Sequence, residues 1–245
     1  MAEATVEVLE TPAAMAQAVA SRVVDVLSRA LSQRDRARCV LAGGSTPVAT
    51  YRLLATEHRG SLDWSRVEFY LGDERAVPPS DPESNGATIR SSLLAGLDVV
   101  EDQFHSIAGD LTAEEAAADY DRLVSLELAD DLWDLVLLGM GADGHTASVF
   151  PGAEEVSPGR LVVTGLAPQA PRERVTMTLN ALNQSREVVM LVCGSNKAEA
   201  LRVALAGEPG VPAGRLQPAG SMTWFVDREA AAQLGDLPHV QSSRH

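Results

Sequence analysis

The stretch LGMGADGHTASVFPG, residues 138–152, places a carboxylate and an imidazole two positions apart in a glycine-rich turn. His145 would be a general base there and Asp143 its orienting partner, because histidine is well matched to proton transfer near neutral pH. A histidine is also commonly a structural residue, and its type alone does not decide between these interpretations. Its position after an apolar, strand-like run favours a site, since sites form at the carboxyl ends of parallel strands.

The same stretch matches a second pattern. Residues 139–144 (GMGADG) fit G-x-G-x-x-G, the dinucleotide-binding fingerprint. That fingerprint needs a long helix after the third glycine and an acidic residue about 20 positions later. Here Pro151 and Gly152 interrupt any long helix, and nothing acidic lies near position 164. The glycines are better interpreted as giving close access to Asp143 and His145, and the sequence predicts no cofactor.

A glycine-rich junction occurs earlier, in VLAGGSTP. An apolar run leads into Gly43, Gly44, Ser45 and Thr46, and a helical pattern begins at Pro47. Unpaired N–H groups at a helix start, together with the helix dipole, favour an anion, and glycines let a phosphate approach the backbone. The alternative is an ordinary strand–helix turn with a Ser or Thr cap. It is not a Walker loop, because no Gly-Lys-Ser/Thr follows.

Charged residues follow other apolar runs. Asp73, Glu74 and Arg75 come directly after EFYLG, either as a solvated loop or as a carboxylate for proton chemistry beside a guanidinium for an anion. Arg174 and Lys197 lie near later strand ends and are either surface charges or further anion ligands. We therefore expect one anion-binding, acid–base site assembled from several strand ends.

Seven apolar runs and six helical patterns alternate along the chain and would position these residues. Their order predicts a mainly parallel sheet with helices on both faces. We expect a single domain over residues 1–238 and a disordered tail over 239–245. The expected strands are 6–10, 38–43, 66–72, 134–141, 173–179, 187–194 and 222–227, and the expected helices are 12–32, 47–57, 86–95, 112–127, 196–206 and 228–234.

Composition excludes several functional classes. The net charge of −14 argues against general nucleic-acid binding, which requires a basic surface. No apolar run approaches eighteen residues and the first residues do not form a signal peptide, so we expect a cytoplasmic protein without a membrane span. There is no G-x-S-x-G or HExxH motif, and the five histidines lack zinc-site spacing, so no metal is predicted.

Six blocks occur in a fixed order over residues 6–235: LAGGSTP, GDERAVPPSDPESN, GMGADGHTASVFPG, RVTMTLNALN, GSNKAEAL and WFVDREAA. Together they resemble the 6-phosphogluconolactonase family. The resemblance implies a three-layer α/β/α fold with a mainly parallel central sheet, shared with glucosamine-6-phosphate deaminase and related to ribose-5-phosphate isomerase. It also implies hydrolysis of a sugar-phosphate lactone, the second step of the oxidative pentose phosphate pathway, without metal or cofactor. Separately, we expect a monomer or weak homodimer.

The resemblance suggests a role for each candidate residue and leaves some roles shared between two or three of them. Phosphate would bind the turn of residues 43–46, with Arg174, Lys197 or Arg75 supplying positive charge. His145 would activate water, Asp143 or Asp73 would orient the imidazole, and Arg75, Lys197 or backbone N–H groups would stabilise the oxyanion.

Two alternatives remain open. A related deaminase would carry Asp-Glu-Tyr where this chain has Asp73, Glu74 and Arg75, and a glutamate where it has Phe150. A non-catalytic sugar-phosphate sensor would need the phosphate turn but not the acid–base pair.

Overall fold

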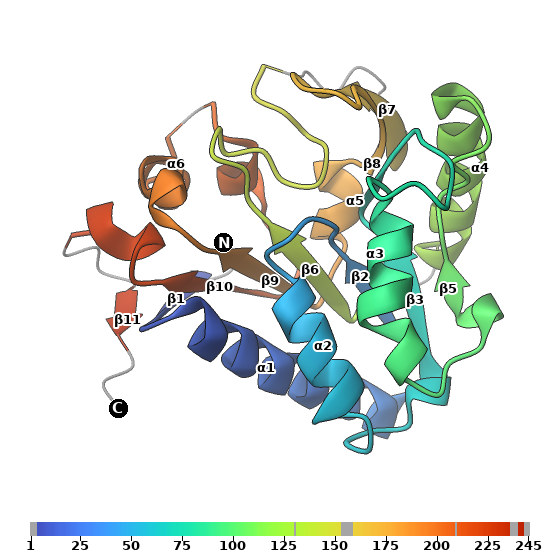
Figure 1. The fold of residues 1–245 in the computed structure, drawn as a ribbon, viewed down its shortest axis with the longest axis horizontal. Coiled ribbons are helices and arrows are strands. Elements are labelled where there is room, and N and C mark those ends of the chain that lie inside the picture. Colours follow the sequence, from blue (N-terminus) through green and yellow to red (C-terminus); the bar gives the residue numbers. More distant parts are fainter. Residues whose placement is uncertain (1–3, 130, 153–158, 209, 236–239, 243–245) are drawn as a thin grey trace.

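The computed structural model describes residues 4–129, 131–152, 159–208, 210–235 and 240–242. Eight strands within these residues form one sheet in the order β11-β1-β10-β9-β6-β2-β3-β5, and every neighbouring pair is parallel. Figure 1 shows this twisted sheet running through the middle of the molecule. The strands are β1 (Ala4–Leu9), β2 (Ala37–Leu41), β3 (Val67–Leu71), β5 (Phe104–His105), β6 (Leu135–Gly139), β9 (Glu187–Val192), β10 (Ser221–Asp227) and β11 (Val240–Ser242).

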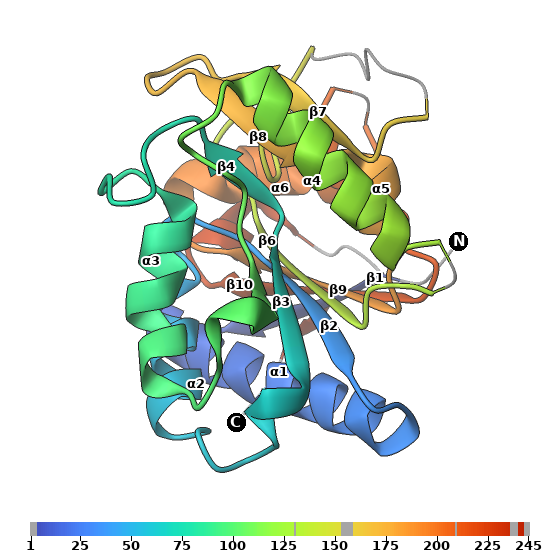
Figure 2. The same cartoon turned by 90° about the vertical axis from the view of Figure 1, so that its right-hand side faces the viewer.

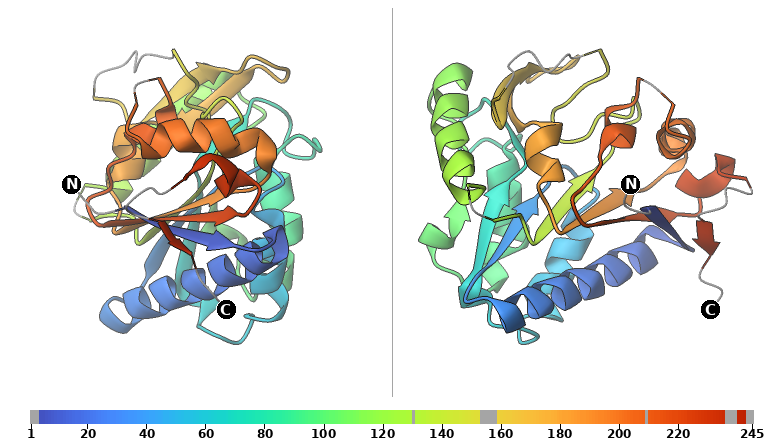
Figure 3. Two further views of the ribbon diagram at one scale, coloured as in Figure 1. Left: turned by 90° about the vertical axis from the view of Figure 1, so that its left-hand side faces the viewer. Right: turned by 180° about the vertical axis from the view of Figure 1, so that it is seen from behind.

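Helices cover both faces of this sheet, which confirms the expected three-layer α/β/α fold. One face carries α1, α2 and α3, and the opposite side carries α4, α5 and α6 (Figures 2 and 3). None of the helices within the described ranges has both the length and the apolar character needed to cross a bilayer. The helices are α1 (Pro12–Gln33), α2 (Val48–Thr56), α3 (Asn85–Ser92), α4 (Ala113–Glu127), α5 (Leu179–Asn183) and α6 (Ala198–Leu205).

Helix α1 illustrates how local sequence sets an element. The Thr11 hydroxyl accepts a hydrogen bond from the N–H of Ala14 at 3.1 Å, and Pro12 occupies the first turn, where its missing N–H costs nothing. Met15 and Val19 lie on the stripe that α1 buries against the sheet. The predicted helix over 12–32 is therefore confirmed to within one residue at its end.

A second, three-stranded sheet lies beside the main one. Its order is β4 (Asp73–Arg75), β8 (Glu173–Met177) and β7 (Val162–Leu166), and both pairings are antiparallel. Strand β3 leads through Gly72 directly into β4, so one chain segment serves both sheets. The sequence predicted the strand over 173–179 but not its antiparallel partners. Helix α4 packs against β7 and β8 (Figure 2).

The end of the chain differs in part from expectation. Residues 240–242, expected to belong to a disordered tail, form β11 and pair in parallel with β1. Residues 239 and 243–245 of that tail lie outside the described residues, and the division into a domain over 1–238 and a tail stays a prediction. The helix expected over 228–234 is a short 3-10 turn, Ala230–Gln233.

Candidate active site

The glycine-rich turn of residues 43–46 joins the carboxyl end of β2 to helix α2. The N-cap of α2 is Pro47, and no side chain caps this helix. The hydroxyls of Ser45 and Thr46 are therefore not used as caps, in contrast to the ordinary capped turn. Gly44 has φ of +81°, a conformation that favours glycine. The turn thus keeps the features of an anion site.

Two cavities meet beside this turn. The first, of about 220 Å³, contains the turn. The second is about 460 Å³, and the two share Asp73, Arg75, His145 and Ala147. The first is lined by residues 42–47, 139–141, Asp73, Arg75, Asn85, His145, Ala147 and Lys197, and the second by Asp73, Arg75, residues 142–143, His145, residues 147–148, Phe150, residues 167–169 and Arg174. The structure therefore assembles the predicted residues around one junction.

Asp143 and His145 form a hydrogen-bonded pair in the loop after β6. The imidazole Nδ1 lies 2.6 Å from Asp143 Oδ1, and the backbone N–H of His145 donates to the same oxygen at 3.2 Å. A carboxylate partner makes Nδ1 the protonated nitrogen and leaves Nε2 as the one that can accept a proton. Partial burial would raise the pKa of Asp143, but these hydrogen bonds and the attraction of His145 outweigh it and lower that pKa.

Two glycines hold the loop tightly around this pair. The N–H of Gly141 donates to the carbonyl of His145 at 2.8 Å, and the N–H of Gly144 donates to the carbonyl of Gly141 at 3.0 Å. A Cβ atom on Gly141 would lie 2.1 Å from Nδ1 of His145 and 2.5 Å from Oδ1 of Asp143. Glycine is required there because any side chain would displace the imidazole.

Asp73, the other candidate partner of His145, is hydrogen-bonded elsewhere. It begins β4, is buried, and its Oδ2 accepts a hydrogen bond from the Ser148 hydroxyl at 2.6 Å. Burial raises the pKa of Asp73, against the lowering effects of Ser148 and Arg75. Of the two candidate partners for His145, the structure hydrogen-bonds Asp143 to the ring and places Asp73 against Ser148.

Glu74 has a supporting position that sequence reasoning missed. Its buried carboxylate accepts the Ser84 hydroxyl at 2.9 Å and the backbone N–H groups of Asn85 at 2.7 Å and Gly86 at 2.8 Å. The N–H of Arg75 donates to it at 2.8 Å. It therefore fixes the start of α3 to β4. The sequence signal that could have indicated this role is the segment ESNG, in which a serine ten residues after Glu74 precedes the start of a helix.

The three candidate cations occupy different places. Arg75 on β4 lies opposite Arg174 on β8 in the antiparallel register and lines both cavities. Arg174 lines only the second cavity, is buried, and its Nη1 has no hydrogen-bond partner among the described residues. Lys197 lines the first cavity with the glycine-rich turn, and burial lowers its pKa although Asp143 opposes the shift.

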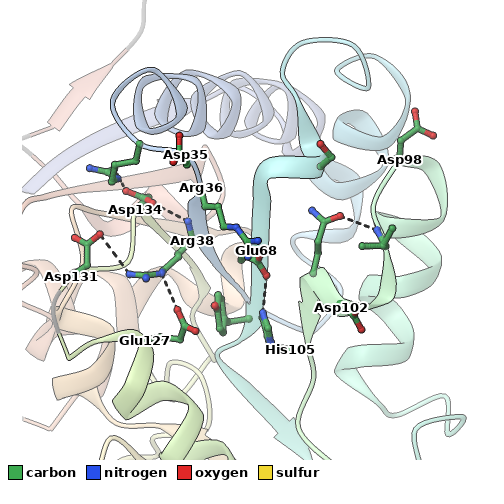
Figure 4. A pocket seen from close by; sticks show the side chains of 15 residues that line it. Asp35, Arg36, Arg38, Glu68, Asp98, Asp102, His105, Glu127, Asp131 and Asp134 are labelled. Carbon is green, nitrogen blue, oxygen red and sulfur yellow. Dashed lines mark hydrogen bonds and ion pairs between the residues drawn. The ribbon is translucent and has the colours of Figure 1, made fainter.

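A larger cavity, about 710 Å³, lies at the opposite, amino-terminal edge of the sheet (Figure 4). Its lining is rich in carboxylates, and several of them form ion pairs. Arg36 pairs with Glu68 at 2.6 Å, His105 pairs with the same carboxylate at 2.8 Å, and Arg38 pairs with Glu127 at 3.0 Å. None of the predicted site residues lines this cavity, and we interpret it as a network of structural ion pairs.

Known proteins share this fold and sequence. A family model described as glucosamine-6-phosphate isomerases/6-phosphogluconolactonase matches residues 10–224. A 6-phosphogluconolactonase of Mycobacterium leprae is 37% identical over 244 residues, covering 94% of this chain and 98% of the relative. The structure of 6-phosphogluconolactonase from Trypanosoma brucei has a TM-score of 0.83 at 30% identity, covering 96% of this chain and all of that one (100%).

A monomeric glucosamine-6-phosphate deaminase has almost the same fold, with a TM-score of 0.82 at 25% identity over 94% of this chain and 99% of its own. The fold and site therefore define a class, that of the glucosamine-6-phosphate isomerases and 6-phosphogluconolactonases. Within that superfamily, the 37% sequence identity to a 6-phosphogluconolactonase over nearly the whole chain determines the family. The chain belongs to the 6-phosphogluconolactonase family.

Proposed function

We propose that this protein hydrolyses 6-phospho-D-glucono-1,5-lactone to 6-phospho-D-gluconate, the second step of the oxidative pentose phosphate pathway. The observation that carries the proposal is the position of His145, which lines the cavity that contains the glycine-rich turn while its Nδ1 lies 2.6 Å from Oδ1 of Asp143. One small cavity is thus lined by both an acid–base group and a turn that can bind an anion.

In this mechanism the substrate phosphate binds the backbone and hydroxyls of residues 43–46, and Lys197 supplies positive charge. Lys197 fits this role better than Arg174 because it lines the cavity that contains the turn, whereas Arg174 does not. The lactone carbonyl then lies toward the junction of the two cavities, near His145.

His145 Nε2 accepts a proton from water as the water oxygen attacks the lactone carbonyl carbon. The ionised Asp143 holds the ring in the required tautomer and stabilises the imidazolium. The tetrahedral oxyanion collapses, the bond from carbon to the ring oxygen breaks, and that oxygen takes the proton from His145. The product carboxylic acid releases its proton to solvent, which balances the reaction.

Arg75 and Arg174 are the groups we assign to the negative charge that develops on the carbonyl oxygen. Their strands place them opposite each other, and both residues line the second cavity. Two adjacent guanidiniums repel each other, so an anion between them relieves that repulsion. Both therefore favour the oxyanion and the product carboxylate over the neutral lactone.

The related deaminase reaction is the main alternative. It needs a further carboxylate at the position of Phe150, according to the resemblance. Here the Phe150 ring packs against His145, with ring centroids 4.7 Å apart, and can transfer no proton. This contact favours the lactonase.

The first experiment follows acid release from freshly prepared lactone above its spontaneous rate. We expect acceleration by the wild type and a loss of about 10²–10⁴-fold in kcat/KM for His145→Ala. His58→Ala is the matched control, because His58 is half-buried just beyond the carboxyl end of α2 and lines neither cavity. Equal activity of His145→Ala and wild type would refute the mechanism.

The same assay separates the alternatives. Ammonia release from glucosamine 6-phosphate without lactone hydrolysis would identify a deaminase. Binding of 6-phosphogluconate without any turnover would identify a sensor. A cytoplasmic monomer or weak homodimer, without nucleic-acid or membrane partners, is the form we propose for the enzyme.

A further inference from the structure

Gln169 lies in the connection between β7 and β8 and lines the second cavity, and no role has been assigned to it above. It is exposed, and its side-chain amide forms no hydrogen bond with the described residues. The backbone around it is anchored, because Nε of Arg172 donates to the carbonyl of Ala167 at 3.2 Å. A free and accessible amide therefore extends from an anchored segment of the cavity wall.

The other polar side chains of the second cavity are already engaged. Its charged side chains are hydrogen-bonded or have a role in the mechanism proposed above. The Ser148 hydroxyl is buried and donates to Asp73 at 2.6 Å. Gln169 is therefore the side chain of this cavity that remains for a neutral polar substituent of a bound molecule.

The proposed orientation of the lactone decides which substituent reaches this amide. The phosphate on C6 binds the turn of residues 43–46 in the first cavity, and the carbonyl carbon C1 lies at the junction of the two cavities, near His145. C2 follows C1 and lies directly across the ring from C5, the carbon that carries C6. Because C2 is thus the ring position farthest from the phosphate, its hydroxyl extends past the junction into the second cavity.

Resting on the function proposed above, we infer that the side-chain amide of Gln169 forms a hydrogen bond with the C2 hydroxyl of the lactone and is a specificity residue. The chemistry of the two groups matches. A hydroxyl both donates and accepts, and the amide can accept through Oε1 or donate through Nε2, whereas a carboxylate only accepts and a guanidinium only donates. The amide is also neutral, so it adds no charge that would oppose the oxyanion forming on the neighbouring carbon.

The test compares Gln169→Ala with the wild type on three freshly prepared 6-phospho-1,5-lactones: the parent and its 2-deoxy and 3-deoxy analogues. Removing the C2 hydroxyl also changes the intrinsic reactivity of the ester, so the readout is the factor in kcat/KM that the variant loses on each lactone. We expect a loss of about 3- to 10-fold on the parent and 3-deoxy lactones, as for one neutral hydrogen bond, and no loss on the 2-deoxy lactone. Gln217→Ala, at an exposed position that lines neither cavity, is the control and should lose nothing on any of them.

An amide that only shapes the cavity wall would give another result. Gln169→Ala would then lose the same factor on all three lactones, which would overturn the inference. An unchanged kcat/KM on the parent lactone would overturn it too, while leaving the lactonase function intact. A loss that disappears on the 3-deoxy lactone instead would overturn it by moving the contact to C3. Failure of the wild type on the parent lactone would remove the proposed function and this inference with it. Alanine at this exposed position should leave folding unchanged, since the amide has no hydrogen-bond partner within the described ranges.

Discussion

Replacing Gly141 by alanine should damage the acid–base pair without changing either of its members. The new Cβ would lie 2.1 Å from Nδ1 and 2.2 Å from Cε1 of His145, and 2.5 Å from Oδ1 of Asp143. Ordinary contact between such atoms needs about 3.5 Å, so the imidazole must move by roughly 1.4 Å. Gly141 does not have a positive φ, so the backbone itself accepts alanine.

A displacement of that size breaks the hydrogen bond between Nδ1 and Asp143, and it moves Nε2 away from the attacking water. Misplacement of a reacting group by 1 Å costs about 10²-fold in rate, so we expect kcat/KM to fall by about that factor. KM should change little, because the phosphate turn is not touched. Stability should also change little, since the His145 ring can swing toward solvent.

Acid release from the lactone, followed with purified Gly141→Ala, provides the measurement. Gly60→Ala is the control, because nothing lies within 4 Å of its added Cβ and its φ is not positive. In a His145→Ala background, Gly141→Ala should have no further effect, since the group that it displaces is already missing. A wild-type kcat/KM in the single variant, or an additive loss in the double variant, would refute this reasoning.

Three further predictions follow from the same geometry. Burial raises the pKa of Asp73 above its unfolded value near 3.8, so its contribution to stability falls as pH rises through the raised value. Asp73→Asn should therefore raise Tm at neutral pH, and melts at pH 4 and pH 7.5 check this; a lower Tm at pH 7.5 would contradict it. Lys197→Ala should raise KM about tenfold or more with kcat nearly unchanged, whereas Arg174→Ala should mainly lower kcat, and steady-state kinetics would show a reversed pattern if the roles are exchanged. Glu74→Gln turns an amide donor toward groups that donate, so unfolding free energy should fall by about 1–3 kcal/mol in urea titrations; an unchanged value would show that the carboxylate does not hold α3.

The sequence was informative where the signals are local. Periodicity and capping located α1 and the strands of the parallel sheet, because burial on both faces leaves continuous apolar runs. The pairing of Asp143 with His145 could be predicted from the sequence for the same reason, because two residues in one tight loop lie close together whatever the rest of the fold does. The sequence could not show which of Asp143 and Asp73 is the hydrogen-bond partner of His145, because Asp73 contacts Ser148, which lies 75 positions away in the sequence.

Non-local pairing explains the other gaps. Strands β4 and β7 carry little periodicity of their own and exist because β8 lies between them. In the sequence, Asn85 has the pattern of an ordinary helix start. Its contacts with Gly43 and Asp73, which lie far from it in the sequence, are seen only in the structure. The division of Arg174 and Lys197 between two cavities likewise depends on how the two sheets are placed relative to each other.

The hairpin of β7 and β8 has a consequence for how this enzyme can change. Its connection, residues 167–172, is closed by a hydrogen bond from the N–H of Ala167 to the carbonyl of Arg172 at 2.8 Å, and residues 167–169 form a rim of the second cavity. The strand register that sets Arg174 opposite Arg75 is held instead at its other side, by β4. Insertions or substitutions in this connection can therefore reshape the entrance while the guanidiniums stay in place. Under the proposed mechanism, the connection would influence which substrates enter, whereas the strand register would hold the guanidiniums that act on the carbonyl oxygen.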